Sequence, residues 1–92
     1  MLTSVKNITL EGMRWVEYRI IYPEGDIQDI PGPLTIMSLV DVNGRPLSLP
    51  LTSARQIVYR VTGQRTRETR NGEERYYLLE QVPVEELEEY VE

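Results

Sequence analysis

Residues 59–82 read YRVTGQRTRETRNGEERYYLLEQV, and this stretch decides the fold. Asn71-Gly72 stands between one segment that begins with Tyr59 and Val61 and another that contains Tyr76 and Tyr77. Asn-Gly between such segments is the strongest short-range signal of a β-hairpin, because both residues accept positive φ. The stretch therefore predicts a long antiparallel hairpin closed by Asn71-Gly72. In that register the opposed pairs are Arg70 with Glu73, Glu68 with Arg75, Arg67 with Tyr76, and Arg65 with Leu78.

The tip of this hairpin, residues 62–75, contains no hydrophobic side chain. A segment of this composition has no apolar face to bury. About ten residues of strand span about 33 Å, whereas a globule of this length has a radius of gyration near 12 Å. We therefore expect residues 62–75, called the arm below, to project from the domain.

Two further hairpins are expected before the arm. The first covers Val5–Tyr22, with Glu11-Gly12 as its turn and Ile8 opposite Trp15. The second covers Leu34–Leu51 around Asn43-Gly44; its two-residue turn would pair Val40 with Leu47 and Val42 with Arg45. Between them, residues 23–33 hold three prolines and two glycines and are predicted to be a loop.

A short C-terminal helix is expected at residues 83–92, where Pro83 suits a helix start and Glu85 and Glu86 favour the positive end of its dipole. Residues 52–63 are interpreted as a strand, because Ile57, Tyr59 and Val61 alternate. The sequence thus predicts one mainly β domain over residues 1–92: a small antiparallel barrel or roll of five to six strands, built from three hairpins, with a C-terminal helix. The alternative is an α+β fold with a helix at about 53–62, capped by Ser53.

Catalysis and metal binding are disfavoured by the side chains that are missing. The chain has no histidine and no cysteine, which removes the imidazole base, the thiolate nucleophile and the usual zinc ligands. No glycine-rich phosphate-binding motif or nucleophile-elbow motif occurs. A chain of 92 residues also leaves little room for a deep pocket of about 300 Å³ or more. We therefore expect a non-enzyme without cofactor or metal.

The charge of the chain is unevenly distributed along the sequence. Six arginines and three glutamates give residues 55–75 a net charge of +3, whereas six glutamates give residues 80–92 a net charge of −6. The whole chain carries −5, which opposes general attraction to nucleic acid or to anionic membranes. No apolar run is long enough to cross a bilayer, and no signal peptide is recognised, so a soluble cytoplasmic protein is expected.

The leading functional hypothesis is a protein–protein interaction module that self-associates through the arm and the acidic helix. Arginine and tyrosine are enriched in interface hot spots, and the acidic helix offers the opposite charge to a second copy. The candidate interaction residues are Arg65, Arg67, Tyr76, Glu85, Glu86, Glu88 and Glu89.

Nucleic-acid binding is the alternative hypothesis. In this hypothesis an arginine- and tyrosine-bearing ribbon stacks on bases and follows phosphates; its candidate residues are Tyr59, Arg60, Arg65, Arg67 and Tyr76. A third possibility is a structural component of a larger assembly. The partner is thus a protein or a second copy, with nucleic acid as the alternative and no membrane.

Overall fold

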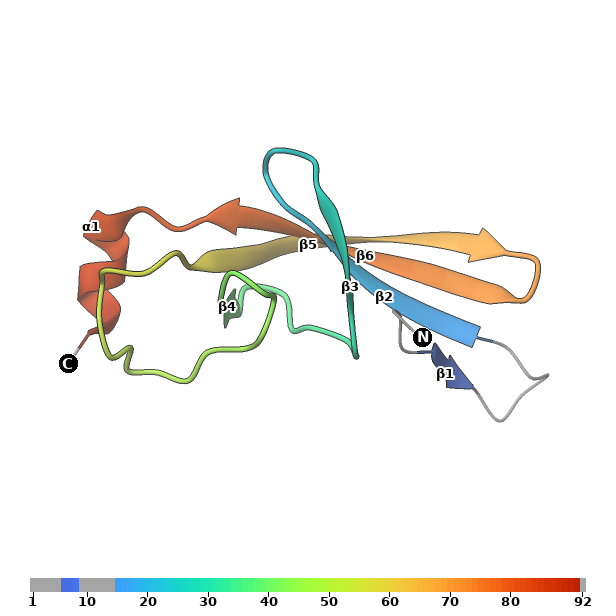
Figure 1. Cartoon of the computed structure of the whole chain (residues 1–92), viewed down its shortest axis with the longest axis horizontal. Helices are drawn as coiled ribbons and strands as arrows, with labels where there is room; N and C mark the ends of the chain where they lie inside the picture. Colours follow the sequence, from blue (N-terminus) through green and yellow to red (C-terminus); the bar gives the residue numbers. More distant parts are fainter. Residues whose placement is uncertain (1–5, 9–14, 92) are drawn as a thin grey trace.

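The computed structural model describes residues 6–8 and 15–91. Within them, six strands form one mixed sheet that curves into a half-barrel, and a short helix follows the last strand (Figure 1). The predicted mainly β fold with a C-terminal helix is therefore confirmed. No helix in the described part of the chain has the length and apolar character needed to cross a membrane. The strands are β1 (Lys6–Ile8), β2 (Trp15–Ile21), β3 (Ile27–Ile30), β4 (Leu39–Val40), β5 (Tyr59–Thr69) and β6 (Gly72–Gln81); the helix is α1 (Val84–Leu87), continued by the 3-10 turn η1 (Glu88–Tyr90).

The centre of the sheet is a parallel pair, which the sequence analysis did not predict. The strand order is β1-β2-β6-β5-β4, and β3 pairs with the part of β2 that β1 leaves free. Strands β2 and β6 run parallel, from Trp15 opposite Gly72 to Ile21 opposite Leu78. The expectation of a wholly antiparallel barrel is thus wrong. The physical reason is that β6 carries the apolar run at residues 76–79, which suits a central strand with a neighbour on each edge.

The first predicted hairpin is confirmed where the structure describes it. Strands β1 and β2 are antiparallel, and Ile8 lies opposite Trp15 as expected. The predicted turn at Glu11-Gly12 lies outside the described residues.

The long hairpin is confirmed, but its loop lies one residue earlier than predicted. Thr69 is opposite Gly72, so Arg70 and Asn71 form the loop. The predicted cross-strand pairs are therefore wrong. Moving the loop by one residue shifts each pairing by two residues, so each side chain still lies on its predicted face of the hairpin. Gly72 is needed in the strand, since a Cβ there would lie 1.9 Å from the carbonyl oxygen of Trp15. The observed pairs are Glu68 with Glu73, Arg67 with Glu74, Thr66 with Arg75, and Arg65 with Tyr76.

The turn around Asn43-Gly44 is also longer than predicted. The Asp41 carboxylate accepts hydrogen bonds from the backbone N–H groups of Asn43 and Arg45, at 2.8 and 2.9 Å. Of the two predicted turn residues, only Gly44 has a positive φ, at 83°, so the two-residue turn with two positive φ values does not form. As a result Val40 bridges Pro46, and the predicted pairing of Val40 with Leu47 is wrong.

Replacing Gly44 by alanine is expected to lower the free energy of unfolding by more than the roughly 1–2 kcal/mol that a left-handed conformation usually costs a residue with a Cβ. The added Cβ would also lie 2.7 Å from Cδ1 of the buried Ile20. Urea denaturation measures the loss. Gly25→Ala is the matched control, because Gly25 has φ of 104° and no atom within 4 Å of an added Cβ. Equal losses in the two variants would show that the contact with Ile20 does not matter.

Two other segments differ from the sequence-based predictions. The predicted loop at 23–33 contains β3, because its prolines lie outside Ile27–Ile30 and leave these four residues free to pair with β2. Residues 52–58 form neither the predicted strand nor the alternative helix at 53–62. They turn around Ser53, whose hydroxyl accepts the Arg55 N–H at 2.9 Å, and β5 begins only at Tyr59.

The core lies away from the arm. One cluster of buried side chains comes mainly from β2, β5 and β6, and a second joins β4 and the helix with residues that flank β5 and β6. The molecule is elongated, with extents of 46 × 26 × 24 Å and a radius of gyration of 14.8 Å. The first cluster includes Val16, Ile20, Val40, Val61, Tyr77 and Leu79; the second comprises Leu39, Leu51, Val58, Val82 and Leu87.

Candidate interaction surface

The arm forms one end of the sheet, and its two strands differ in their surroundings (Figure 1). Its β6 half lies between β5 and β2, and residues 73–76 are half-buried. Its β5 half pairs with β6 alone among the described residues, and every residue from Gln64 to Thr69 is exposed. The arm is therefore not a ribbon free on both sides. Its accessible part is Gly63–Thr69, called the open edge of β5 below.

Two of the predicted interaction residues lie on this open edge with exposed side chains. Arg65 has no ion-pair partner among the described residues. The Arg67 side chain is 74% exposed, and its Nη1 lies 3.9 Å from an oxygen of Glu74. Arg70, in the adjoining loop, is exposed as well. These three cations are available for contact with another molecule.

Tyr76, which was predicted to contact a partner, is held inside a polar network centred on Arg19. Its hydroxyl donates to Glu74 at 2.9 Å, and the Arg19 guanidinium lies over its ring, 5.8 Å from the centroid. Arg19 also contacts three carboxylates, those of Asp29 at 2.8 Å and of Glu17 and Glu74 at 3.0 Å. Tyr76 therefore stabilises the contacts between β2 and β6 and is not free for a partner. Arg65 and Arg67 remain as the exposed predicted residues of this face.

Electrostatic effects stabilise this network in its charged form. Burial opposes the charged state of Arg19, but hydrogen bonds with Glu74, Asp29 and Tyr76 outweigh it and raise the pKa of the guanidinium. Hydrogen bonds from Arg19 and Tyr76 lower the pKa of the Glu74 carboxyl. Arg19 was not among the predicted site residues, although Glu17 and Arg19 lie two residues apart on one face of β2 and indicate a charged pair there.

The acidic helix presents three of its four predicted residues to solvent. Glu85, Glu88 and Glu89 are exposed. Glu86 is half-buried and forms an ion pair with Arg60, and it also accepts a hydrogen bond from the Tyr90 hydroxyl at 3.0 Å. Glu86 therefore fastens the helix to β5 and is not free for a partner.

Two residues of the predicted nucleic-acid ribbon do not lie on an accessible surface. Tyr59 is only 7% exposed, and its ring packs edge-on against Tyr22 at 5.3 Å. The Arg60 side chain is 15% exposed and is bound by Glu80 and Glu86. The placement of Tyr59 and Arg60 on a base-stacking ribbon is therefore wrong, because β4 and the helix cover this part of β5.

Comparison with family models found a match over residues 14–90 to a family described as "Uncharacterised Treponema protein". The chain belongs to this family. The match runs from β2 to η1, so the family includes both the open edge of β5 and the acidic helix. No curated protein and no solved structure matches the chain.

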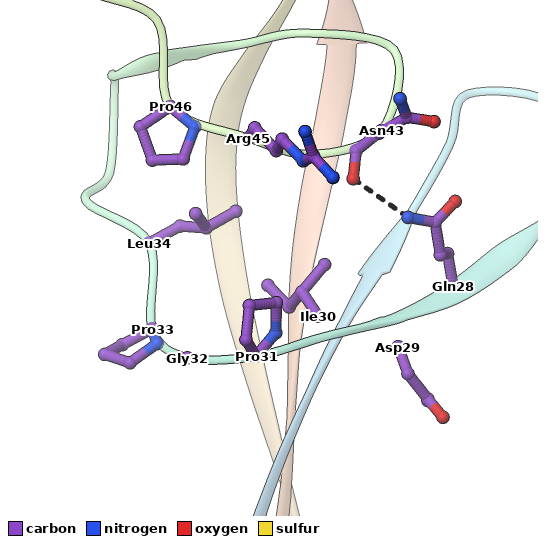
Figure 2. A pocket seen from close by; sticks show the side chains of 11 residues that line it. Gln28, Asp29, Ile30, Pro31, Gly32, Pro33, Leu34, Asn43, Arg45 and Pro46 are labelled. Atoms are coloured by element: carbon purple, nitrogen blue, oxygen red, sulfur yellow. Dashed lines mark hydrogen bonds between the residues drawn. The ribbon is translucent and has the colours of Figure 1, made fainter. Parts of the chain in front are cut away.

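The family region also contains an open groove between the segment after β3 and the turn at residues 43–46 (Figure 2). Its volume is about 770 Å³, larger than the small size of the chain led us to expect. Ile30, Pro31 and Leu34 line its apolar side, whereas Asp29 points away from it. The Asp29 carboxylate is bound by Arg19, so the groove has no free carboxylate among its lining residues.

Proposed function

We propose that this chain is a non-enzymatic protein–protein interaction module, and that two copies associate through opposite charges at the two ends of the molecule. Arg65, Arg67 and Arg70 are exposed at the arm end. The helix end presents three exposed glutamates, Glu85, Glu88 and Glu89. The two ends lie at opposite extremes of an axis 46 Å long (Figure 1), so these arginines do not reach the three helix-end glutamates of their own chain. This separation carries the proposal, because it leaves both sets of charges for a second copy.

A side-by-side antiparallel dimer satisfies both ends at once. A two-fold axis places each arm beside the helix of the partner, so the same contact occurs twice and the assembly closes. A head-to-tail chain of copies would leave one arm and one helix without a partner at its ends. The closed dimer is therefore the proposed assembly.

The expected association is weak and sensitive to salt. An exposed ion pair contributes about 0.2–1 kcal/mol, so six such pairs contribute a few kcal/mol, in the range of a millimolar Kd. Exposed apolar side chains on segments at the helix end, those of Leu49, Ile57 and Val84, add to the contact area. Salt weakens charge contacts of this kind because they are accessible to counterions.

Reversing the charges at each end separately and then mixing the variants tests the proposal. The arm variant carries Arg65→Glu and Arg67→Glu, and the helix variant carries Glu88→Arg and Glu89→Arg. Each variant alone has two ends of like charge and is expected to be monomeric by sedimentation velocity at low salt. Their equimolar mixture restores opposite charges at both contacts of the dimer and is expected to associate at least as strongly as the wild type.

The matched control is the double variant Arg45→Glu, Arg55→Glu, which changes two exposed arginines outside the arm by the same total charge. It is expected to associate like the wild type. A wild-type chain that stays monomeric at about 1 mM protein, where a millimolar Kd would give a large dimer fraction, overturns the proposal. A mixture of the two variants that stays monomeric does the same.

A further inference from the structure

The open edge of β5 begins where the neighbouring strand stops covering it. On the side away from β6, β4 pairs with Tyr59 and Arg60. The cover ends at Val61, whose N–H donates to the Ser38 carbonyl at 3.0 Å and whose carbonyl accepts from the Met37 N–H at 2.7 Å. From Gly63 to Thr69 no strand of the described chain pairs with this side of β5. Such an edge offers unpaired backbone N–H and carbonyl groups to an extended segment.

Two exposed apolar side chains stand at the point where the cover ends. Ile36 is 43% exposed and Met37 is 63% exposed. Met37 also has φ of 72°, a strained conformation that residues with a side chain rarely adopt. Its backbone N–H bonds to Val61, so the structure holds a bulky apolar side chain in solvent beside the start of the open edge.

The charges on the open edge define the partner that it fits. Arg65 and Arg67 are two residues apart in a strand, so they lie on the same face. A strand added to this edge would place two alternate side chains directly opposite them, at about 4.5–5.5 Å between Cβ atoms. Acidic side chains at those two positions are favourable there. Glu68 lies on the other face and disfavours an acid opposite itself.

A second copy of β5 does not fit this edge. In a two-fold antiparallel pairing, residue numbers of opposed residues add to twice the number of the central residue. Any such pairing that overlaps at least five of residues 63–69 is centred on residue 65, 66 or 67. Each of these registers puts Arg65 or Arg67 opposite an arginine of the other copy, and directly opposed like charges are destabilising.

We infer that the open edge of β5 accepts an extended strand of a partner protein, with two acidic side chains at alternate positions and an apolar side chain that follows them. The acids face Arg67 and Arg65, and the apolar side chain lies against Ile36 and Met37. The pairing is antiparallel, the commoner arrangement of paired strands in sheets. This inference rests on the proposed function in taking the arm as an interaction surface.

A labelled peptide tests the inference directly. The probe is acetyl-Thr-Lys-Glu-Thr-Glu-Val-Thr-Leu-amide, whose glutamates fall opposite Arg67 and Arg65 in the antiparallel register. Binding is measured by fluorescence anisotropy with the wild-type chain at about 10 µM, where contacts worth a few kcal/mol leave it monomeric. The double variant Arg65→Ala, Arg67→Ala is expected to bind at least tenfold more weakly, whereas Arg45→Ala, Arg55→Ala is expected to bind unchanged.

Two readouts separate strand addition from simple attraction between charges. Two further peptides carry backbone N-methyl groups, one at the odd-numbered and the other at the even-numbered residues, and both keep the two glutamates. One of them is expected to bind at least tenfold more weakly, because its methyl groups replace the N–H hydrogens that would bond to β5. Amide hydrogen exchange is expected to slow in residues 63–69 when the peptide binds. Equal binding of both N-methylated peptides, or no protection of residues 63–69, overturns the inference.

The remaining outcomes show whether the strand addition or the proposed self-association is wrong. A single-stranded oligonucleotide that binds the arm while the peptide does not would overturn the inference in favour of a nucleic-acid partner. Failure of the wild-type chain to form dimers tests only the proposed self-association, because the peptide experiment uses another partner and monomeric protein. Conversely, a salt-sensitive dimer together with an unbound peptide leaves the self-association standing and overturns the strand addition.

Discussion

Gly72→Ala is expected to lower the free energy of unfolding by about 3 kcal/mol or more, a large fraction of the 5–15 kcal/mol typical of a small domain. A Cβ at position 72 would lie 1.9 Å from the carbonyl oxygen and 2.6 Å from the nitrogen of Trp15. Both atoms belong to the backbone, so no side-chain rotation relieves the overlap. The variant must separate β2 from β6 at the start of their parallel pairing, where the Trp15 N–H also donates to the Asn71 carbonyl at 2.9 Å.

Urea denaturation and far-ultraviolet circular dichroism measure the effect, and two other glycines provide controls. An added Cβ meets nothing within 4 Å at Gly32 and only a Leu78 methyl at an ordinary 3.5 Å at Gly63. Both Gly32→Ala and Gly63→Ala are expected to stay within about 1 kcal/mol of the wild type, the usual size of glycine-to-alanine effects on the unfolded chain. A Gly72→Ala variant as stable as these controls would mean that β2 does not pack against β6 as described.

The role of Gly72 also shows how far the sequence predicts the fold. Asn71-Gly72 is a strong local signal, and it predicted the hairpin because turn chemistry acts within a few residues. The loop position was off by one residue because Gly72 is required by β2, more than 50 residues earlier in the chain. The parallel pairing of β2 and β6 leaves no short-range pattern, so alternation and turn signals led to an antiparallel barrel.

For the candidate site too, features set by nearby residues were predictable and features set by distant residues were not. The exposure of Arg65 and Arg67 was predictable, because a segment without apolar side chains has nothing to bury. The network around Arg19 was not predictable, because its partners come from β2, β3 and β6. Tyr59 and Arg60 were misplaced for the same reason: the strand and helix that cover them are distant in sequence.

Arg19→Met is expected to lower the free energy of unfolding at pH 7 by about 2–3 kcal/mol. Removing one partner from a buried pair costs about 3–5 kcal/mol, and a partly exposed site costs less. The side chains of Glu17, Asp29 and Glu74 are 17%, 28% and 18% exposed, and each loses its contact with Arg19. Methionine retains much of the apolar stem, so the loss reports mainly on the charge. Arg45→Met, at an exposed arginine without an ion pair among the described residues, is expected to change stability by less than about 0.5 kcal/mol.

The loss of stability at acid pH is expected to be smaller in Arg19→Met than in the wild type. In the wild type the pKa of Glu74 is lowered by folding, so its stabilising contribution is present above the ordinary glutamate pKa of about 4.3. That contribution is lost as the pH falls through the lower pKa of the folded state. In the variant the hydrogen bond from Arg19, the largest cause of the lowered pKa, is gone, so the pKa of Glu74 moves back up toward its ordinary value, while the hydrogen bond from Tyr76 still lowers it. The contribution of Glu74 that is lost at acid pH is therefore smaller in the variant than in the wild type. Urea denaturation at pH 7 and at about pH 3, below the ordinary glutamate pKa, measures the two losses, and adding Glu74→Gln to the wild type should reduce its loss as well. A variant that loses as much stability as the wild type over this interval would show that Arg19 does not lower the pKa of Glu74.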